Sequence, residues 1–198
     1  MMDFSQLKDA LASRSFDLVA EICDELMLQV ASRGINFQQE WPYAIHLLGH
    51  IYINDLNSAR FLWKSIPDGI KESRQEVVAA WKIGQCLWNR DFAGVYRAIS
   101  AFEWSQEALD LVNAFRESYT KRTFELLVSA YSTINVTDAA LFLGMSEDDA
   151  INYAVQHGWR LDSAAGMLEV VKPKVISEQK LDSSKLQRLT EYVFHLEH

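Results

Sequence analysis

The chain has 198 residues, of which 49% are hydrophobic and 23% are charged, as in an ordinary globular protein with a substantial core. Its 19 lysines and arginines are outnumbered by 27 acidic residues, so the formal net charge is -8. Because phosphate backbones and anionic lipids attract positive charge, this balance argues against nucleic acid and membrane surfaces as partners. The longest apolar stretches, such as Tyr43 to Leu48, are far too short to span a bilayer, and the N-terminus lacks the basic end and apolar run of a leader, so we expect an intracellular protein.

The first hundred residues are predicted to form three pairs of helices. Only eight glycines and three prolines interrupt the chain, and apolar residues recur at spacings of three and four, as in amphipathic helices. Gly34 and Pro67 supply stops, and Pro42 suits a first helical turn. The predicted pairs cover residues 3–13 with 15–33, 41–54 with 56–66, and 76–89 with 92–102.

The second and third pairs are weakly similar to one another at an offset of 35 residues, so that Gly49 falls on Gly84. A period of this length is typical of stacked helical hairpins of the tetratricopeptide type. We therefore expect a mainly α fold with TPR-like repeats over residues 1–104, and the pattern changes at Ser105.

Residues 105–173 are predicted to form a winged helix. A long helix over 106–130 precedes a short strand at 133–136, two short helices, and a hairpin at 159–171. Helices, a strand and a terminal hairpin in this order are typical of that fold.

The two short helices carry clear capping signals. Thr137 is expected to cap the first helix, which would begin at Asp138, and Gly144 to end it in a left-handed turn. Ser146 with Asp149 three residues later resembles a capping box for the second helix.

The second short helix has the position of a DNA-recognition helix, but it begins with Glu147, Asp148 and Asp149. A like-charge pair at 4 Å costs about 1 kcal/mol even in bulk water, so carboxylates near phosphates oppose binding. Acids in a first helical turn instead complement the helix dipole. The predicted fold is therefore that of a DNA-binding module, but its charge is unfavourable for binding DNA. A winged-helix nucleic-acid-binding regulator is kept only as the alternative function.

The last segment, 174–198, is predicted to be a polar link followed by a helix over 182–198. This helix carries an apolar stripe at coiled-coil spacing, and so short a tail contains no obvious segment against which the stripe could pack. We therefore favour burial of the stripe against another chain over packing onto the rest of this chain. The stripe consists of Leu186, Leu189, Val193 and Leu196.

The sequence contains no convincing catalytic pattern. His46 and His50 lie four residues apart, but no Glu follows the first His and no third ligand is evident, so two helical histidines are favoured over a metal site. Asp148 and Asp149 are adjacent and point about 100° apart on a helix. We expect no enzyme activity, no metal, no cofactor and no small-molecule substrate.

Cysteines and tryptophans are predicted to be core residues. Cys23 and Cys86 sit inside apolar helical patterns without metal-ligand spacing, which favours buried free thiols. The six tryptophans at helical spacing are likewise assigned to the core rather than to an exposed cluster.

Seven runs of this sequence resemble the PCI-domain family, whose members occur in the proteasome lid, the constitutive photomorphogenesis (COP) signalosome and eukaryotic initiation factor three. More narrowly, they resemble the plant form of the subunit-8 family of that signalosome. The runs are FDLVAEICDELMLQVAS, WPYAIHLL, SARFLWKSIP, VVAAWKIGQ, YSTI, LFLGMSEDDAI and DSSKLQRLTEYVFHLEH.

The resemblance implies a non-catalytic scaffold subunit found in cytoplasm and nucleus, whose partners are other PCI subunits. In that family winged helices associate through sheet edges, and C-terminal helices gather in a bundle. The complex removes a ubiquitin-like modifier from cullins with a zinc metalloprotease in a different subunit, and this chain lacks that enzyme's His-x-His and Asp pattern. The implied interface residues are Ser132, Thr133, Ile134, Asn135 and Val136 at the edge, with the hairpin 159–171, and Leu186, Leu189, Tyr192, Val193 and Leu196 in the bundle.

Overall fold

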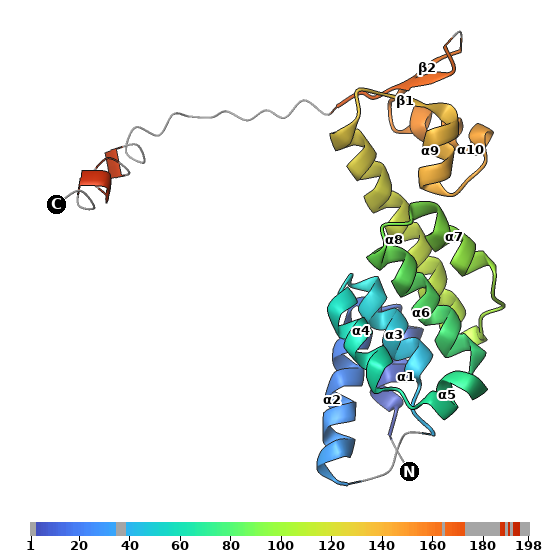
Figure 1. The fold of residues 1–198 in the computed structure, drawn as a ribbon, viewed down its shortest axis with the longest axis vertical. Helices are drawn as coiled ribbons and strands as arrows, with labels where there is room; N and C mark the ends of the chain where they lie inside the picture. The colour runs from blue at the N-terminus through green and yellow to red at the C-terminus, as the bar shows by residue number, and fades with distance from the viewer. Residues whose placement is uncertain are drawn as a thin grey trace.

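The computed structural model describes residues 3–34, 39–163, 165–172, 187–188, 190 and 192–194. Over these residues the protein is mainly α, with one small sheet, which confirms the predicted fold class (Figure 1). The N-terminal helices are α1 (Ser5–Ala12), η1 (Phe16–Leu18), α2 (Val19–Ser32), α3 (Tyr43–Tyr52), α4 (Leu56–Ser65), α5 (Asp68–Ser73), α6 (Gln75–Trp88) and α7 (Phe92–Ser100).

The helix α3 lies at the centre of the N-terminal part. Every residue from Tyr43 to Ile51 is buried, as expected for a helix that is apolar on all sides. It contacts α2, α4, α6 and α8 (Gln106–Ala130), and Gly49 allows it to approach α2 closely. The short α5 and the 3-10 turn η1, which leads directly into α2, were not predicted from the sequence.

Three helical hairpins share one corner geometry. Arg14, Asn54 and Arg90 each adopt a left-handed backbone, with φ of 57°, 62° and 56°. In each corner the next residue donates its N–H to a carbonyl five positions earlier, at 2.9 Å. The side chains of Asp55 and Asp91 then cap α4 and α7. The repeat seen weakly in the sequence is therefore a repeat of this helix, corner and helix.

One of the six tryptophans differs from the prediction. Trp41 and Trp159 are buried, whereas Trp88 is 48% exposed and three others are half-buried. Trp63 stacks on Trp81 with ring centroids 5.6 Å apart, and Arg60 lies over the Trp88 ring at 4.9 Å. Trp63, Trp81 and Trp104 pack against the N-terminal core, so the assignment to the core was wrong only for Trp88, whose exposed ring is stabilised by a cation. The two cysteines are buried and free, as predicted.

The helix α8 connects two hydrophobic clusters. Leu111, Phe115 and Tyr119 belong to the cluster formed by the N-terminal helices, and Phe124 and Leu127 belong to the cluster of the winged helix. At about 1.5 Å per residue its 25 residues extend roughly 37 Å. Figure 1 shows this helix running from the first group of helices into the second.

The winged helix consists of β1 (Thr133–Asn135), α9 (Val136–Leu143), α10 (Glu147–Gln156), β2 (Arg160–Asp162) and β3 (Met167–Glu169). The sheet order is β1-β3-β2, and both pairs are antiparallel. Ile134 lies opposite Leu168, and Leu161 lies opposite the same residue on the other side. The predicted order of elements is therefore confirmed, including the hairpin.

One predicted cap was wrong. The side chain of Asn135, not Thr137, caps α9, because its Oδ1 accepts the Thr137 N–H at 3.0 Å. The helix consequently begins at Val136, two residues earlier than expected. The Thr137 hydroxyl instead donates to Glu147 at 2.9 Å. Asn is at least as good a cap as Thr, and its extended backbone places the amide oxygen correctly.

The corner between α9 and α10 packs against α7. Gly144 has φ of 63°, as predicted, and a Cβ at this position would overlap the ring of Tyr96. Phe92 and Phe142 add an edge-to-face contact at 5.6 Å. Only glycine satisfies both the left-handed backbone and the close approach at this corner.

We predict that Gly144→Ala lowers the free energy of unfolding by about 2–4 kcal/mol, combining left-handed strain with overlap against Tyr96. Gly158→Ala is the matched control, since Gly158 also has positive φ but a Cβ there meets nothing within 4 Å. The control should cost only about 1–2 kcal/mol. Urea denaturation measures both, and equal costs would contradict the close contact.

Candidate protein-interaction surface

The winged-helix sheet ends in two exposed strands. Within the described residues β1 pairs only with β3 on one side, and β2 pairs only with β3 on the other (Figure 1). An edge strand presents unpaired backbone N–H and C=O groups that can pair with a strand of another chain. The sheet therefore offers two short edges for strand addition.

The register shows which groups of β1 face outward. Val170 N–H donates to Ser132 O at 2.9 Å, and Val136 N–H donates to Gly166 O at 3.2 Å. Residues whose backbone groups face the partner strand alternate in an antiparallel pair. The N–H and C=O groups of Thr133 and the N–H of Asn135 therefore face away from β3, whereas the C=O of Asn135, as the N-cap residue, belongs to the first turn of α9.

Side chains of the predicted edge residues divide in the same way. Ser132, Thr133 and Asn135 are exposed, whereas Ile134 and Val136 are buried in the winged-helix core. Ile134 and Val136 thus hold β1 in place, since their side chains are buried and their backbone groups face β3, and they offer no contact of their own to an added strand. Of the predicted bundle residues, Tyr192 and Val193 are helical and 63% and 54% exposed, and Leu186, Leu189 and Leu196 lie outside the described residues.

Exposed apolar side chains lie close to the β1 edge. Tyr131 directly precedes Ser132 and Val171 directly follows Val170, so both lie just beyond the bond between Ser132 and Val170. Leu126, one turn before the end of α8, is 52% exposed. An apolar surface next to free backbone groups is typical of a strand-addition interface. The exposure of these side chains was not predicted from the sequence.

A cluster of rings holds α10 and the hairpin against α8. Phe124 stacks on Trp159 at 4.7 Å and meets Tyr153 edge to face at 5.2 Å. Burial raises the pKa of Tyr153, so the phenol stays neutral, and the nearby Glu125 carboxylate acts in the same direction. The orientation of both sheet edges relative to α8 is fixed by this packing.

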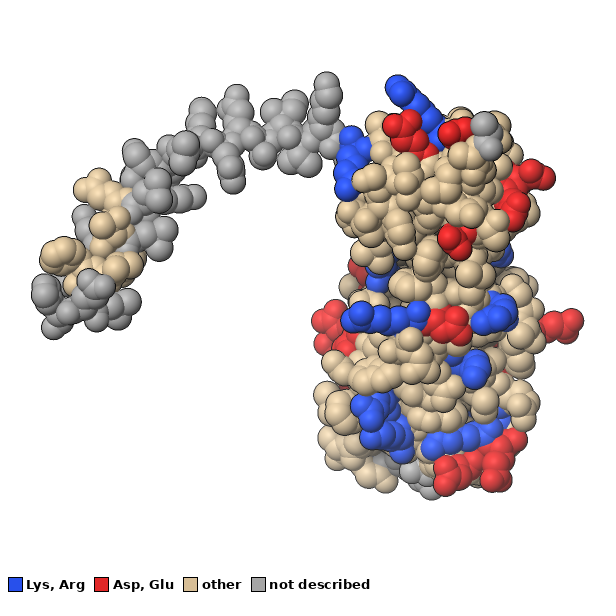
Figure 2. All heavy atoms as spheres, turned by 45° about the horizontal axis from the view of Figure 1, so that its top comes forward, with Lys and Arg blue, Asp and Glu red and all other residues tan. Residues whose placement is uncertain are grey.

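The acidic start of α10 is a cap, as predicted. Ser146 accepts the Asp149 N–H at 3.2 Å and donates to the Asp149 carboxylate at 2.7 Å. Glu147, Asp148 and Asp149 are all exposed. On the face drawn in Figure 2, acidic and basic side chains are mixed on the winged helix and form no continuous basic surface. The exposed carboxylates at the start of α10 would repel a phosphate backbone at the position where a recognition helix approaches DNA.

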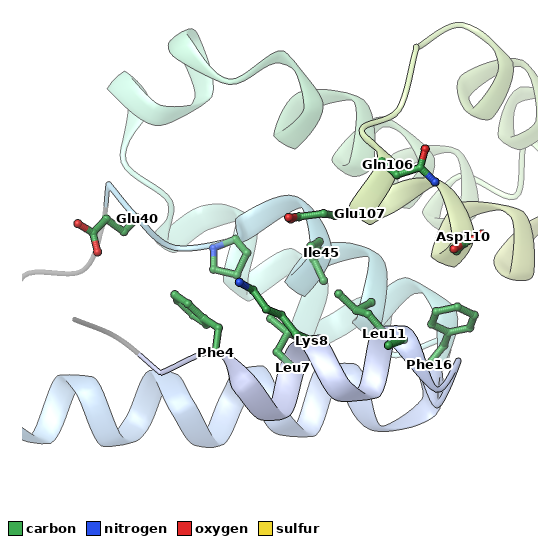
Figure 3. A pocket seen from close by; sticks show the side chains of 12 residues that line it. Phe4, Leu7, Lys8, Leu11, Phe16, Glu40, Ile45, Gln106, Glu107 and Asp110 are labelled. Carbon is green, nitrogen blue, oxygen red and sulfur yellow. The ribbon is translucent and has the colours of Figure 1, made fainter.

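A pocket of about 500 Å³ opens between α1, the start of α3 and the start of α8 (Figure 3). Its wall is mostly apolar, and charged side chains also line it, with Lys8 drawn among the apolar side chains in Figure 3. Its titratable side chains, among the described residues that line it, are those of Lys8, Glu40, Glu107 and Asp110. The lining residues are Phe4, Leu7, Lys8, Leu11, Ala12, Phe16, Glu40, Pro42, Ile45, Gln106, Glu107 and Asp110.

The two helical histidines have a third polar neighbour that sequence spacing did not indicate. Asp24 of α2 lies 2.8 Å from His46 Nε2 and 3.4 Å from His50 Nε2. The hydrogen bond from His46 lowers the pKa of Asp24, and burial lowers the pKa of His46. Asp24 is 22 residues distant from His46 in sequence, so the spacing of the histidines gave no sign of this neighbour.

A model of the CSN8/PSMD8/EIF3K family matches residues 38–179 of this chain. The chain belongs to this family. The resemblance inferred from the sequence is thereby confirmed at the level of the family. Within the described residues, no helix combines the length and apolar character needed to cross a membrane.

Similar proteins extend the match to the whole chain. COP9 signalosome complex subunit 8 of Arabidopsis thaliana is 64% identical over 197 residues, covering 100% of both chains. The proteins of the same name from Xenopus laevis and Dictyostelium discoideum are 38% and 28% identical, and each match covers 99% of this chain. The match covers 100% of the Xenopus protein and 98% of the Dictyostelium protein.

Proposed function

We propose that this chain is a non-catalytic subunit of the COP9 signalosome that joins neighbouring subunits. The observation that carries the proposal is the 64% identity, over the entire length of both chains, to a protein named as subunit 8 of that complex. The assembly to which the sequence resemblance points removes a ubiquitin-like modifier from cullins. In this proposal another subunit catalyses the reaction, and this chain provides the surfaces that bind neighbouring subunits.

The proposed surfaces are the β1 edge and the terminal helix. The outward N–H and C=O of Thr133 and the outward N–H of Asn135, with Tyr131 exposed shortly before β1, suit addition of a strand from a neighbouring PCI subunit. The opposite edge, β2, is exposed at all three residues and could serve a second neighbour. The apolar stripe of the terminal helix would join a bundle of helices from several subunits.

We assign three parts of the chain to three tasks in the assembly. Residues 1–104 present helical repeats, residues 105–173 present the sheet edges, and residues 174–198 carry the bundle helix. Partners are other PCI subunits in a hetero-oligomer, in cytoplasm and nucleus. A role as a winged-helix nucleic-acid-binding regulator has less support, since exposed acids begin α10 and the matched relatives are named as signalosome subunits.

We predict that Thr133→Pro weakens capture of a neighbouring subunit about two- to tenfold, because proline removes one outward N–H worth about 0.5–1.5 kcal/mol. The bonds from β1 to β3 made at Ser132 and Val136 remain. Thr133→Val is the matched control, since it removes the hydroxyl and keeps the N–H. Competition between tagged variants for the complex in cells measures the effect, and equal capture of both variants would contradict an edge interface.

We also predict that deleting residues 182–198 removes the chain from the large assembly while the remainder stays folded. Burial of four side chains of Leu or Val size is worth on the order of 6–12 kcal/mol before ordering costs, so its loss outweighs the other contacts. A finer test replaces Val193 in the stripe by Asp and compares it with Gln187→Asp, outside the stripe.

Size-exclusion chromatography of cell extracts measures the assembly of these variants. The deletion and Val193→Asp should elute as free chain, whereas Gln187→Asp should elute with the complex. Co-purification of the truncated chain with the intact complex would contradict the role of the terminal helix.

A further inference from the structure

We propose that Asp24, His46 and His50 form a binding site for a divalent transition-metal ion, with Zn²⁺ as the best fit, that links α2 to α3. The proposal is independent of the signalosome function. It rests on the mutual distances of three potential ligand atoms, on the chemistry of those atoms, and on access from solvent.

The three atoms are spaced as ligands of one ion. Asp24 Oδ1 lies 2.8 Å from His46 Nε2 and 3.4 Å from His50 Nε2, and the two Nε2 atoms are 3.1 Å apart. Tetrahedral zinc with bonds of about 2.0–2.1 Å separates neighbouring ligand atoms by about 3.3 Å. The observed spacing needs to widen by only a few tenths of an ångström to admit the ion.

The composition of the site also fits zinc. Two imidazoles come from one face of α3, four residues apart, and the carboxylate comes from a different helix. Two histidines with one carboxylate are a known zinc ligand set, in which water takes the fourth position. His46 and His50 are almost fully buried, whereas the Asp24 side chain is 53% exposed, so the ion can enter and hold a water from the Asp24 side.

The surroundings of the Nδ1 atoms of His46 and His50 influence which ring nitrogen of each histidine carries the proton. Trp41 Nε1–H donates to His46 Nδ1 at 3.3 Å, which places the proton of a neutral His46 on Nε2, facing Asp24. A metal at Nε2 must displace that proton, and Nδ1 then carries one, so the Trp41 hydrogen bond has to open. His50 Nδ1 has no hydrogen-bond partner in the described structure, so no bond opposes the tautomer that ligates through Nε2.

The hydrogen bond from Trp41 allows a metal site to be distinguished from a cluster of hydrogen bonds that holds no ion. In both cases His46 and Asp24 stabilise the contact between α2 and α3. Only a metal site predicts that Trp41 opposes binding, because its N–H favours the tautomer in which Nε2 is protonated. Removal of that donor should therefore strengthen the binding of zinc.

The test uses the full-length protein, stripped with a chelator and titrated with zinc chloride by calorimetry. We expect one zinc per chain and a rise in the thermal midpoint with zinc, as for any ligand of the native state. Loss of a residue that only hydrogen-bonds to a metal ligand typically weakens binding about 10- to 100-fold. As direct ligands, Asp24 and His50 should matter more, so Asp24→Asn and His50→Ala should each weaken zinc binding by more than about 100-fold. Asp24→Asn is the safer variant for folding, since the side chain is half-exposed.

Matched controls are Glu25→Gln, an exposed acid next to Asp24, and His157→Ala, an exposed histidine on the winged helix. Both should leave the affinity unchanged, and Trp41→Phe should raise it severalfold. Absence of zinc binding by the intact chain would overturn the proposal. Binding that survives both Asp24→Asn and His50→Ala would overturn it as well, because the zinc would then occupy other groups.

Discussion

The burial of one continuous helix in two hydrophobic clusters determines the arrangement of the rest of the molecule. The first part of α8 packs through Leu111 and Phe115 among the N-terminal helices, and its last turns pack through Phe124 and Leu127 in the winged helix. Each buried side chain of this size contributes about 1.5–3 kcal/mol, so neither end can leave its cluster cheaply. The contact of Gly144 with Tyr96 gives a second connection between the two parts. The sheet edges are therefore held in a defined direction relative to the repeats, as a scaffold requires.

Much of this fold could be predicted from the sequence because its determinants are local. Amphipathic spacing marks the helices, Gly144 marks a left-handed corner, and Ser146 with Asp149 marks a helix start. The cap of α9 was misplaced because Asn135 and Thr137 are both good capping residues, and the choice depends on where the strand ends. The exposure of Trp88 depends on what packs against each side of a helix, which composition does not show.

The candidate sites were predicted to different extents. The position of the β1 edge followed from the order of elements and from the family resemblance, but the outward direction of Thr133 required the register with β3. The approach of Asp24 to His46 and His50 depends on the packing of α2 on α3, which Gly49 permits. Contacts between residues far apart in sequence have no local signal, so sequence spacing alone left the histidine pair without a third ligand.

The central claim is that this chain works as a subunit of a multi-subunit assembly through the winged-helix edge and the terminal helix. The most direct measurement is affinity purification of the full-length chain from cell extract under native conditions, followed by mass spectrometric quantification of everything that elutes with it. The account predicts other PCI-domain subunits of the COP9 signalosome in amounts close to one per chain. Recovery of the chain alone, or with nucleic acid and no other PCI subunit, would contradict it.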